Sequence, residues 1–258
     1  MSSQQATGTA AAETTGDPTI GSPAARVGTE GATGQRGPSG HIAFDVADGV
    51  ATLELRRPEK RNAISAEMCE SVVEVLDATA GRPDVRVLVV QGAGGVFSAG
   101  ADLGAVKKPD GTAADSFRQS YARALRAVVD FPVPSVARIE GPCIGGGCSL
   151  ALACDLRFAH PSATFAIPAV RHGILYDEPS VARLVRLVGP SRAARLLYTA
   201  ERIDAAAALK IGFIDECGKD LEALLTDFAG AVALGRPETV VATRRLLRDV
   251  QLSGSVPS

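Results

Sequence analysis

Three consecutive glycines, Gly145, Gly146 and Gly147, stand between a segment that predicts a strand and one that predicts a helix. The apolar residues 134–140 before them fit a buried strand, and the apolar residues 150–154 after them fit a helix. Glycine allows a backbone to approach another group closely, and the first N–H groups of a helix have no partner inside it. An N–H at this turn can therefore bind an anion or stabilise a developing oxyanion. The plainer interpretation is a glycine-rich turn that permits tight packing.

A second glycine-rich loop follows another short apolar segment. Residues 85–90 predict a buried strand, and the loop 92–103 after it contains four glycines. Two junctions of this kind can each direct one N–H at a single carbonyl oxygen. The pair of loops therefore favours a site that stabilises negative charge on an oxygen.

These loops, together with a third segment, resemble a known superfamily. Phe97-Ser-Ala-Gly-Ala-Asp-Leu103 and Gly141-x-x-x-Gly-Gly-Gly-Cys-x-Leu150 resemble the two oxyanion-hole segments of the crotonase (enoyl-CoA hydratase/isomerase) superfamily. Arg57-Pro-Glu-Lys-Arg-Asn-Ala-Ile-Ser65 resembles its CoA-contacting turn. The motifs stand in the same order and the resemblance extends over residues 41–248. It implies an α/β fold of the crotonase-like (ClpP/crotonase) type, a spiral of ββα repeats.

The resemblance also implies a substrate and a set of site residues. The oxygen of an acyl-CoA thioester would lie between the backbone N–H groups of Ala101 and Gly146, which would make an enolate accessible. The residues that would contact CoA are Arg61, Ala63, Ala99, Asp102 and Leu103. The implied activity is that of a lyase or isomerase of fatty acid metabolism. CoA enters as part of the substrate, and we expect no other cofactor and no metal.

The two carboxylates of an ordinary hydratase are missing from the positions where the resemblance places them. One position is Ser149, after the triple glycine, and the other is Ala169, after the proline of the next predicted strand. Hydration requires groups that activate water and move a proton, and neither side chain can do this as a carboxylate does. We therefore do not expect ordinary hydration by two glutamates.

Other candidate side chains follow in the segment 172–179. Tyr176 stands where the superfamily's methylmalonyl-CoA decarboxylases carry a pocket tyrosine, and Asp177 and Glu178 stand where some relatives carry a substituted acid or base. We select all three as candidate catalytic residues. The alternative is that Asp177 and Glu178 only begin a helix, because acidic residues favour a helix N-terminus.

Two further classes of function have to be weighed. The segment 147–151 is close to a G-x-S-x-G nucleophile elbow, but that fold needs a histidine after the acid, and the histidines are His41, His160 and His172. A serine hydrolase is therefore disfavoured, and we interpret His160 and His172 as structural or surface residues. The other class is a non-catalytic acyl-CoA-binding protein that keeps the scaffold without the acids. Decarboxylation stays open too, because loss of carbon dioxide generates an enolate without a general base.

Periodicity predicts the elements that would position these loops. Strands are expected at 42–46, 50–55, 85–91, 134–140, 155–159 and 163–166. Helices are expected at 65–81, 112–130, 179–188, 191–199, 204–210, 221–234 and 237–250. Ser65 is the expected N-cap of the first helix, and Asp48-Gly49 predicts a tight hairpin turn.

Composition limits the partners of the protein. The chain has 258 residues, 46% of them apolar, and a net charge of −2, so we expect no nucleic-acid partner. No apolar run reaches the length of about 18 residues that suggests a membrane span. Five cysteines without a CxxC pair fit small buried thiols in a reducing cytoplasm. We expect a cytoplasmic protein.

The ends of the chain also carry predictions. Residues 1–40 are rich in Ala, Gly, Ser, Thr and Pro, which predicts a disordered tail before a crotonase-like domain at 41–258. Superfamily members usually continue through two more C-terminal helices. A homo-oligomer, a trimer or hexamer by resemblance, is therefore in question.

Overall fold

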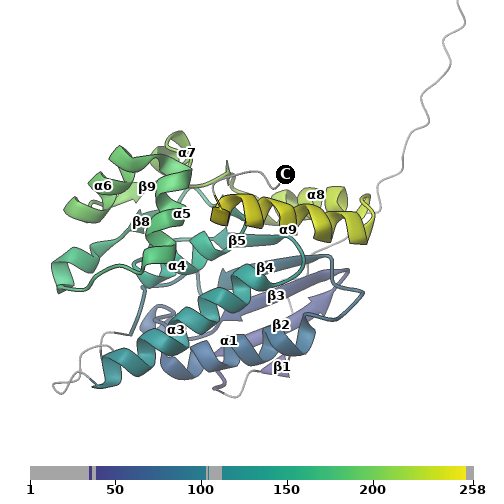
Figure 1. The fold of residues 1–258 in the computed structure, drawn as a ribbon, viewed down its shortest axis with the longest axis horizontal. Helices are drawn as coiled ribbons and strands as arrows, with labels where there is room; N and C mark the ends of the chain where they lie inside the picture. The colour runs from purple at the N-terminus through teal and green to yellow at the C-terminus, as the bar shows by residue number, and fades with distance from the viewer. Residues whose placement is uncertain (1–34, 37–38, 103, 105–111, 254–258) are drawn as a thin grey trace, which may run out of the picture.

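The structure is a computed structural model that describes residues 35–36, 39–102, 104 and 112–253. Within this part of the chain, a seven-stranded sheet has the order β1-β2-β3-β4-β5-β7-β10 (Figure 1). Its strands are β1 (Gln35–Arg36), β2 (Ile42–Ala47), β3 (Val50–Leu55), β4 (Val87–Gly92), β5 (Ser135–Ile139), β7 (Leu156–Ala159) and β10 (Glu216–Cys217). The strands from β3 to β10 are parallel neighbours, and β2 pairs with β3 in an antiparallel hairpin.

Helices cover both faces of this sheet. One face carries α1 (Ala66–Thr79), α3 (Thr112–Asp130) and α4 (Gly146–Ala153), and the other carries α8 (Leu221–Ala233). In Figure 1, α1 and α3 run in front of the sheet. Strand β4 shows why both faces are buried: Leu88 and Val90 join the core beneath α1 and α3, whereas Val87 and Val89 join the cluster that contains Leu225 of α8. Such continuous apolar strands are typical of parallel sheets.

A smaller sheet of three strands stands beside the large one. It consists of β6 (Pro142–Ile144), β8 (Thr164–Ala166) and β9 (Ile203–Asp204). The helical elements beside it are η2 (Pro168–His172), α5 (Glu178–Val188), α6 (Pro190–Thr199) and α7 (Ala205–Lys210), whereas α9 (Pro237–Ser253) lies against the end of α3, where Arg248 pairs with Asp130. Because β6 runs directly into α4, the triple-glycine turn lies where the two sheets meet.

The turn that precedes α1 is fixed by one buried side chain. This turn contains η1 (Pro58–Lys60), and Asn62 follows it with no exposed surface. The amide nitrogen of Asn62 donates to the carbonyl oxygens of Ala93 (2.9 Å) and Val96 (2.6 Å), and its amide oxygen accepts from the N–H of Arg57 (2.9 Å). Its φ of 54° is left-handed, a conformation that asparagine tolerates better than most residues. Asn62 thus joins the turn to the first glycine loop.

The sequence predicted most of these elements, and the exceptions are short. The helix at Thr112–Asp130 has the expected bounds, Ser65 is the N-cap of α1, and Asp48 and Gly49 form the hairpin turn with positive φ. Strand β6 was not expected. Strand β1, in which Gln35 and Arg36 pair with β2, lies inside the segment 1–40 and was not expected, whereas the domain boundary at residue 41 stays a prediction. Residues 1–34 lie outside the described part.

Composition led to predictions about the cysteines and about membrane spans. Four of the five cysteines are buried and free, and Cys217 is half-buried and free. Across the described residues, we find no helix whose length and apolar character would suffice to cross a bilayer.

The substitution Asn62→Ala should lower the free energy of unfolding by about 2–4 kcal/mol, because it leaves two carbonyls and one N–H without their partner. Denaturant unfolding followed by circular dichroism would measure this. Arg61→Ala is the matched control, since Arg61 has a φ of 51° but an exposed side chain. We expect a change within about 0.5 kcal/mol for the control. Equal losses in the two variants would mean that the hydrogen bonds of Asn62 do not fix this turn.

Candidate active site

Backbone hydrogen bonds align the first glycine loop between two other segments. On one side, Ser98 exchanges bonds with Pro142 and Ile144 (3.0 and 2.9 Å). On the other, Ile64 donates to the carbonyl of Gly100 (2.8 Å) and accepts from the N–H of Asp102 (2.9 Å). Backbone groups alternate in direction along an extended chain, so the N–H of the residue between Gly100 and Asp102 faces away from Ile64. That residue is Ala101.

The two glycine loops approach each other so closely that neither has room for a side chain. A Cβ atom on Gly100 would lie 2.8 Å from the carbonyl oxygen of Ile144 and 3.2 Å from the nitrogen of Gly146. A Cβ atom on Gly146 would in turn lie 3.2 Å from the nitrogen of Ala101. Gly100 also has a φ of +99°, which favours glycine. The structure therefore brings the backbone nitrogens of Ala101 and Gly146 close together, and their role as oxyanion donors stays a prediction.

Two tyrosine hydroxyls fix the direction of the peptide groups at the triple-glycine turn. Tyr176 donates to the carbonyl oxygen of Gly145 (3.0 Å), and Tyr121 of α3 donates to that of Gly146. In a planar trans peptide, the carbonyl of Gly145 and the N–H of Gly146 point in opposite directions. Tyr176 therefore also orients the N–H of Gly146. Within the described residues, neither this N–H nor that of Ala101 donates a backbone hydrogen bond.

These hydroxyls remain donors over the working pH range. Burial raises the pKa of Tyr121 and that of Tyr176 well above the ordinary value for tyrosine, so both stay protonated. Tyr121 also stacks on Phe117 with 5.6 Å between the ring centroids. The sequence predicted the helix that contains Tyr121 but assigned this residue no role in the site. The signal it missed is that a buried tyrosine hydroxyl needs a hydrogen-bond partner.

A cavity of about 170 Å³ opens beside the two backbone nitrogens. Its lining is mostly apolar and comes from both glycine loops, α3, α4, η2 and the segment before α5. Ser149 and Ala169, the positions where the resemblance places the two acids, both line it. Arg118 and His172 line it with exposed side chains, and His160 lies elsewhere, hydrogen-bonded to Ser162.

Asp177 is the only acid among the described residues that line this cavity. Its Oδ2 accepts a hydrogen bond from the hydroxyl of Ser149 (2.9 Å), and its Oδ1 caps α5 by accepting from the N–H of Ser180 (3.0 Å). The helix-start interpretation is thus correct for Asp177, yet the same carboxylate also faces the cavity. Glu178 is exposed and outside the lining, so the structure does not support its selection as a catalytic residue.

The hydrolase alternative lacks its required geometry. Ser149 is fully buried inside α4 instead of standing on a strand-to-helix elbow, and its hydroxyl is bonded to Asp177. A nucleophilic serine needs a neighbouring base, which is usually a histidine. The histidine that lines this cavity, His172, is exposed and makes no hydrogen bond to Ser149 in the described structure.

The residues predicted to contact CoA lie around the turn before α1 and the first glycine loop. Arg61 and Ala99 are exposed, Ala63 is half-buried, and Leu103 lies outside the described residues. Asp102 is engaged in an ion pair with Arg57 at 2.8 Å. The hydrogen bond from Arg57 lowers the pKa of the Asp102 carboxyl, so this pair persists at neutral pH and joins the two segments.

The substitution Gly100→Ala should lower the free energy of unfolding by about 2–5 kcal/mol, from a strained backbone and a clash with Ile144. Gly81→Ala is its control, because a Cβ atom there meets nothing within 4 Å. We expect the control to be neutral or stabilising by up to about 1 kcal/mol. Urea titrations of the two variants would measure both values. A Gly100→Ala variant as stable as the control would show that the loops are not closely packed.

The chain is similar in sequence to known proteins. The family model for enoyl-CoA hydratase/isomerase matches residues 45–229. A protein of Mycobacterium leprae named "Probable enoyl-CoA hydratase echA6" is 37% identical over 217 residues, covering 81% of this chain and 83% of that protein. The enoyl-CoA hydratase EchA19 of Mycobacterium tuberculosis is 35% identical over 207 residues, or 77% of each chain.

Solved structures of other proteins have a similar fold. DspI of Pseudomonas aeruginosa matches with a TM-score of 0.79 and 28% identity, covering 82% of each chain. An enoyl-CoA hydratase of Shewanella pealeana matches with a TM-score of 0.76 and 27% identity, covering 84% of this chain and 82% of that one. The predicted crotonase-like α/β fold is therefore confirmed. The chain belongs to the enoyl-CoA hydratase/isomerase family, within the crotonase superfamily.

Proposed function

We propose that this protein is an enzyme that binds acyl-CoA thioesters and reacts them through an enolate. The thioester oxygen would lie between the N–H groups of Ala101 and Gly146. The observation that carries this proposal is the contact between the two glycine loops, which leaves two backbone N–H groups free beside an apolar cavity. Fixed donors of this kind stabilise the charge of an enolate without reorganisation during the reaction.

The reaction we propose uses a single carboxylate, Asp177. Ordinary hydration uses two carboxylates, and the cavity has Ser149 and Ala169 at those positions, so we do not expect efficient hydration of crotonyl-CoA. One carboxylate suffices to remove a proton next to the thioester and to return it, either to the same carbon or to another carbon of the conjugated enolate. The second outcome is isomerisation of a carbon–carbon double bond.

Deuterium exchange would test the enolate directly. With acyl-CoA substrates in D₂O, we expect the unmodified protein to incorporate deuterium at the carbon next to the thioester. Asp177→Asn should slow this exchange by roughly 10²-fold or more, because it removes the proton acceptor. Asparagine is also a good N-cap, so α5 should stay folded. Mass spectrometry of the recovered thioester measures the exchange.

Glu178→Gln is the matched control, because this neighbouring carboxylate lies outside the cavity. We expect its exchange rate to equal that of the unmodified protein. Equal rates in all three proteins would exclude Asp177 as the base. Binding of a non-hydrolysable acyl-CoA analogue without any exchange would instead identify a non-catalytic acyl-CoA-binding protein.

Tyr176→Phe should weaken binding of the acyl-CoA analogue about 3–10-fold, because the peptide that carries the N–H of Gly146 loses one hydrogen bond that orients it. Isothermal titration calorimetry measures this effect. Tyr198→Phe is the control, since Tyr198 is 78% exposed. If Tyr176→Phe binds as tightly as the control, the hydroxyl of Tyr176 does not position that donor.

Decarboxylation of a carboxylated acyl-CoA is the second candidate. It is favoured by Arg118 and His172, two side chains that can carry positive charge at the rim of the cavity. Tyr176 stands where the superfamily's methylmalonyl-CoA decarboxylases carry a pocket tyrosine, but here its hydroxyl donates to the carbonyl oxygen of Gly145. Release of carbon dioxide that persists in Asp177→Asn would favour this reaction, because decarboxylation needs no base. A cytoplasmic location and a homo-oligomer remain predictions.

A further inference from the structure

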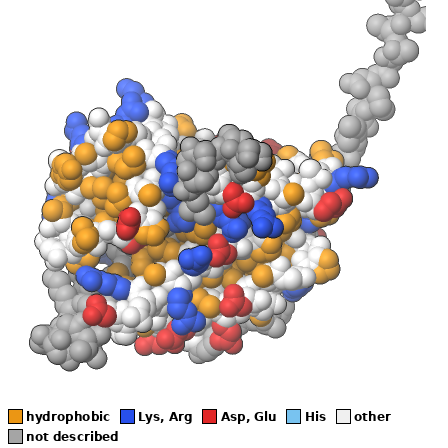
Figure 2. Space-filling view, in the orientation of Figure 1, with side chains coloured by type: hydrophobic (Ala, Val, Ile, Leu, Met, Phe, Trp, Pro, Cys, Tyr) orange, Lys and Arg blue, Asp and Glu red, His pale blue; other side chains and the backbone are white. Residues whose placement is uncertain are grey.

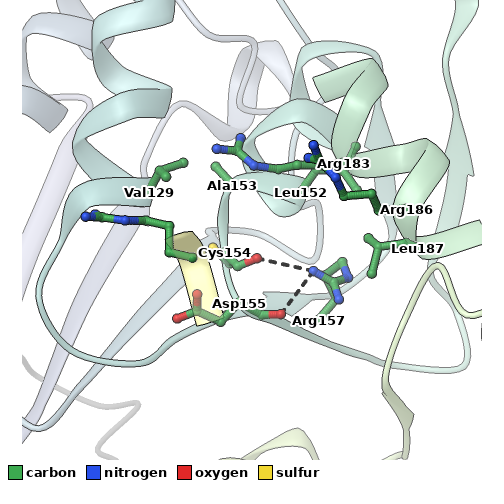
Figure 3. Close-up of a pocket in the computed structure, with 10 residues that line it drawn as sticks. Val129, Leu152, Ala153, Cys154, Asp155, Arg157, Arg183, Arg186 and Leu187 are labelled. Atoms are coloured by element: carbon green, nitrogen blue, oxygen red, sulfur yellow. Dashed lines mark hydrogen bonds between the residues drawn. The ribbon is translucent and has the colours of Figure 1, made fainter. Parts of the chain in front are cut away.

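A second cavity, of about 290 Å³, lies at the opposite end of α4 from the glycine turn. Figure 3 shows its lining, which includes the last residues of α4 and the side chains of Arg157, Arg183, Arg186 and Arg248. Asp155 is the only acid among the described lining residues. In Figure 2, basic side chains gather on this face of the molecule beside α9. The cavity is thus lined by four arginines from three separate elements and by one acid.

Some of these arginines are already neutralised. Arg157 is buried and forms an ion pair with Asp215 (2.6 Å), and Arg248 forms one with Asp130 (3.0 Å). The one acid of the lining is occupied too, because Asp155 accepts from Arg244 (2.6 Å) and from the backbone and hydroxyl of Ser135. No free carboxylate of the described lining remains for a further cation.

Arg183 and Arg186, both on α5, differ from these arginines because no carboxylate among the described residues pairs with them. Within the described structure, neither guanidinium has a hydrogen bond or an ion pair. Arg183 is half-buried, and this burial lowers its pKa, whereas the charges of Asp177 and Asp130 act in the opposite direction without forming an ion pair with it. A partly buried guanidinium that no carboxylate contacts directly is unfavourable, and an anion bound in the cavity would reduce that cost.

We propose that this cavity is a binding site for a phosphate group, either as the free ion or as a small phosphate monoester. Phosphate suits the site because a dianion balances the two unpaired charges of Arg183 and Arg186. The planar guanidinium also presents two parallel N–H donors that match phosphate oxygens. A volume of about 290 Å³ leaves room for a small organic group beside the phosphate.

This site is distinct from the one proposed for acyl-CoA. The segments predicted to contact CoA precede α1 and follow β4, whereas this cavity is formed by α3, α4, β7, α5 and α9. Helices α3 and α4 nevertheless contribute to both cavities. Gly146 begins α4 and Cys154 follows its end, and Asp177 caps the N-terminus of α5, the helix that carries Arg183 and Arg186. A phosphate bound here would therefore contact helices that also support the acyl cavity.

Calorimetric titration of the full-length protein with inorganic phosphate tests the proposal. The ionic strength is kept constant with chloride, because nonspecific attraction to arginines depends on salt. We expect saturable binding at one site per chain. Arg186→Gln should raise the dissociation constant at least tenfold. Arg183→Lys, which retains the charge but loses the planar fork, should raise it by a smaller factor.

Arg192→Gln is the matched control, since it removes an exposed arginine of α6 that lies outside the cavity. It should bind phosphate as the unmodified protein does. Because Arg186 is exposed, its variant should fold normally, and circular dichroism would verify this. A parallel titration with glycerol phosphate separates the two ligands: tighter binding than inorganic phosphate identifies a monoester site. Absence of saturable phosphate binding, or equal binding by Arg186→Gln and Arg192→Gln, would overturn the proposal.

Discussion

The orientation of one peptide group, between Gly145 and Gly146, is the constraint on which the rest of the site depends. Its N–H belongs to the first residue of α4, so it has no partner within the helix and is free for an anion. Its carbonyl accepts from the hydroxyl of Tyr176 and from the N–H of Ser149. The N–H of Gly145 donates to Ala166 of the small sheet (2.8 Å). The small sheet, the first turn of α4 and the segment before α5 therefore all contribute to the direction of a single N–H.

The same constraint explains why glycine is required at specific positions and not throughout the loops. Gly100 and Gly146 lie where the two loops meet, and a side chain on either would separate the nitrogens of Ala101 and Gly146. At Gly95, although its φ of +69° is left-handed, a Cβ atom would meet only open space. Close approach of the two loops therefore requires glycine at Gly100 and Gly146. At Gly95, glycine is favoured only by the left-handed backbone.

The sequence predicted the backbone part of the site better than its side chains. Glycine spacing and strand-to-helix junctions are local signals that predicted the two loops, and the resemblance to the crotonase superfamily then indicated Ala101 and Gly146 within them. The bond between Ser149 and Asp177 joins residues 28 positions apart, and no periodicity encodes it. Asp177 and Glu178 are adjacent acids at one helix start, and only the packing of α5 determines which of them faces the cavity. Strand β1 was missed because its partner, β2, is what gives two residues of a polar segment a fixed conformation.

Ser149 illustrates how a site can change its chemistry while its polar groups stay satisfied. A buried hydroxyl needs a partner, and Asp177 provides one from a different helix. In the proposed reaction, this pair replaces two carboxylates with one, so the cavity contains a single negative charge beside the enolate instead of two. Fewer negative charges near a developing anion favour its formation, since like charges in a cavity of low polarity repel strongly. A site of this composition is therefore better suited to forming an enolate and moving its proton than to activating water.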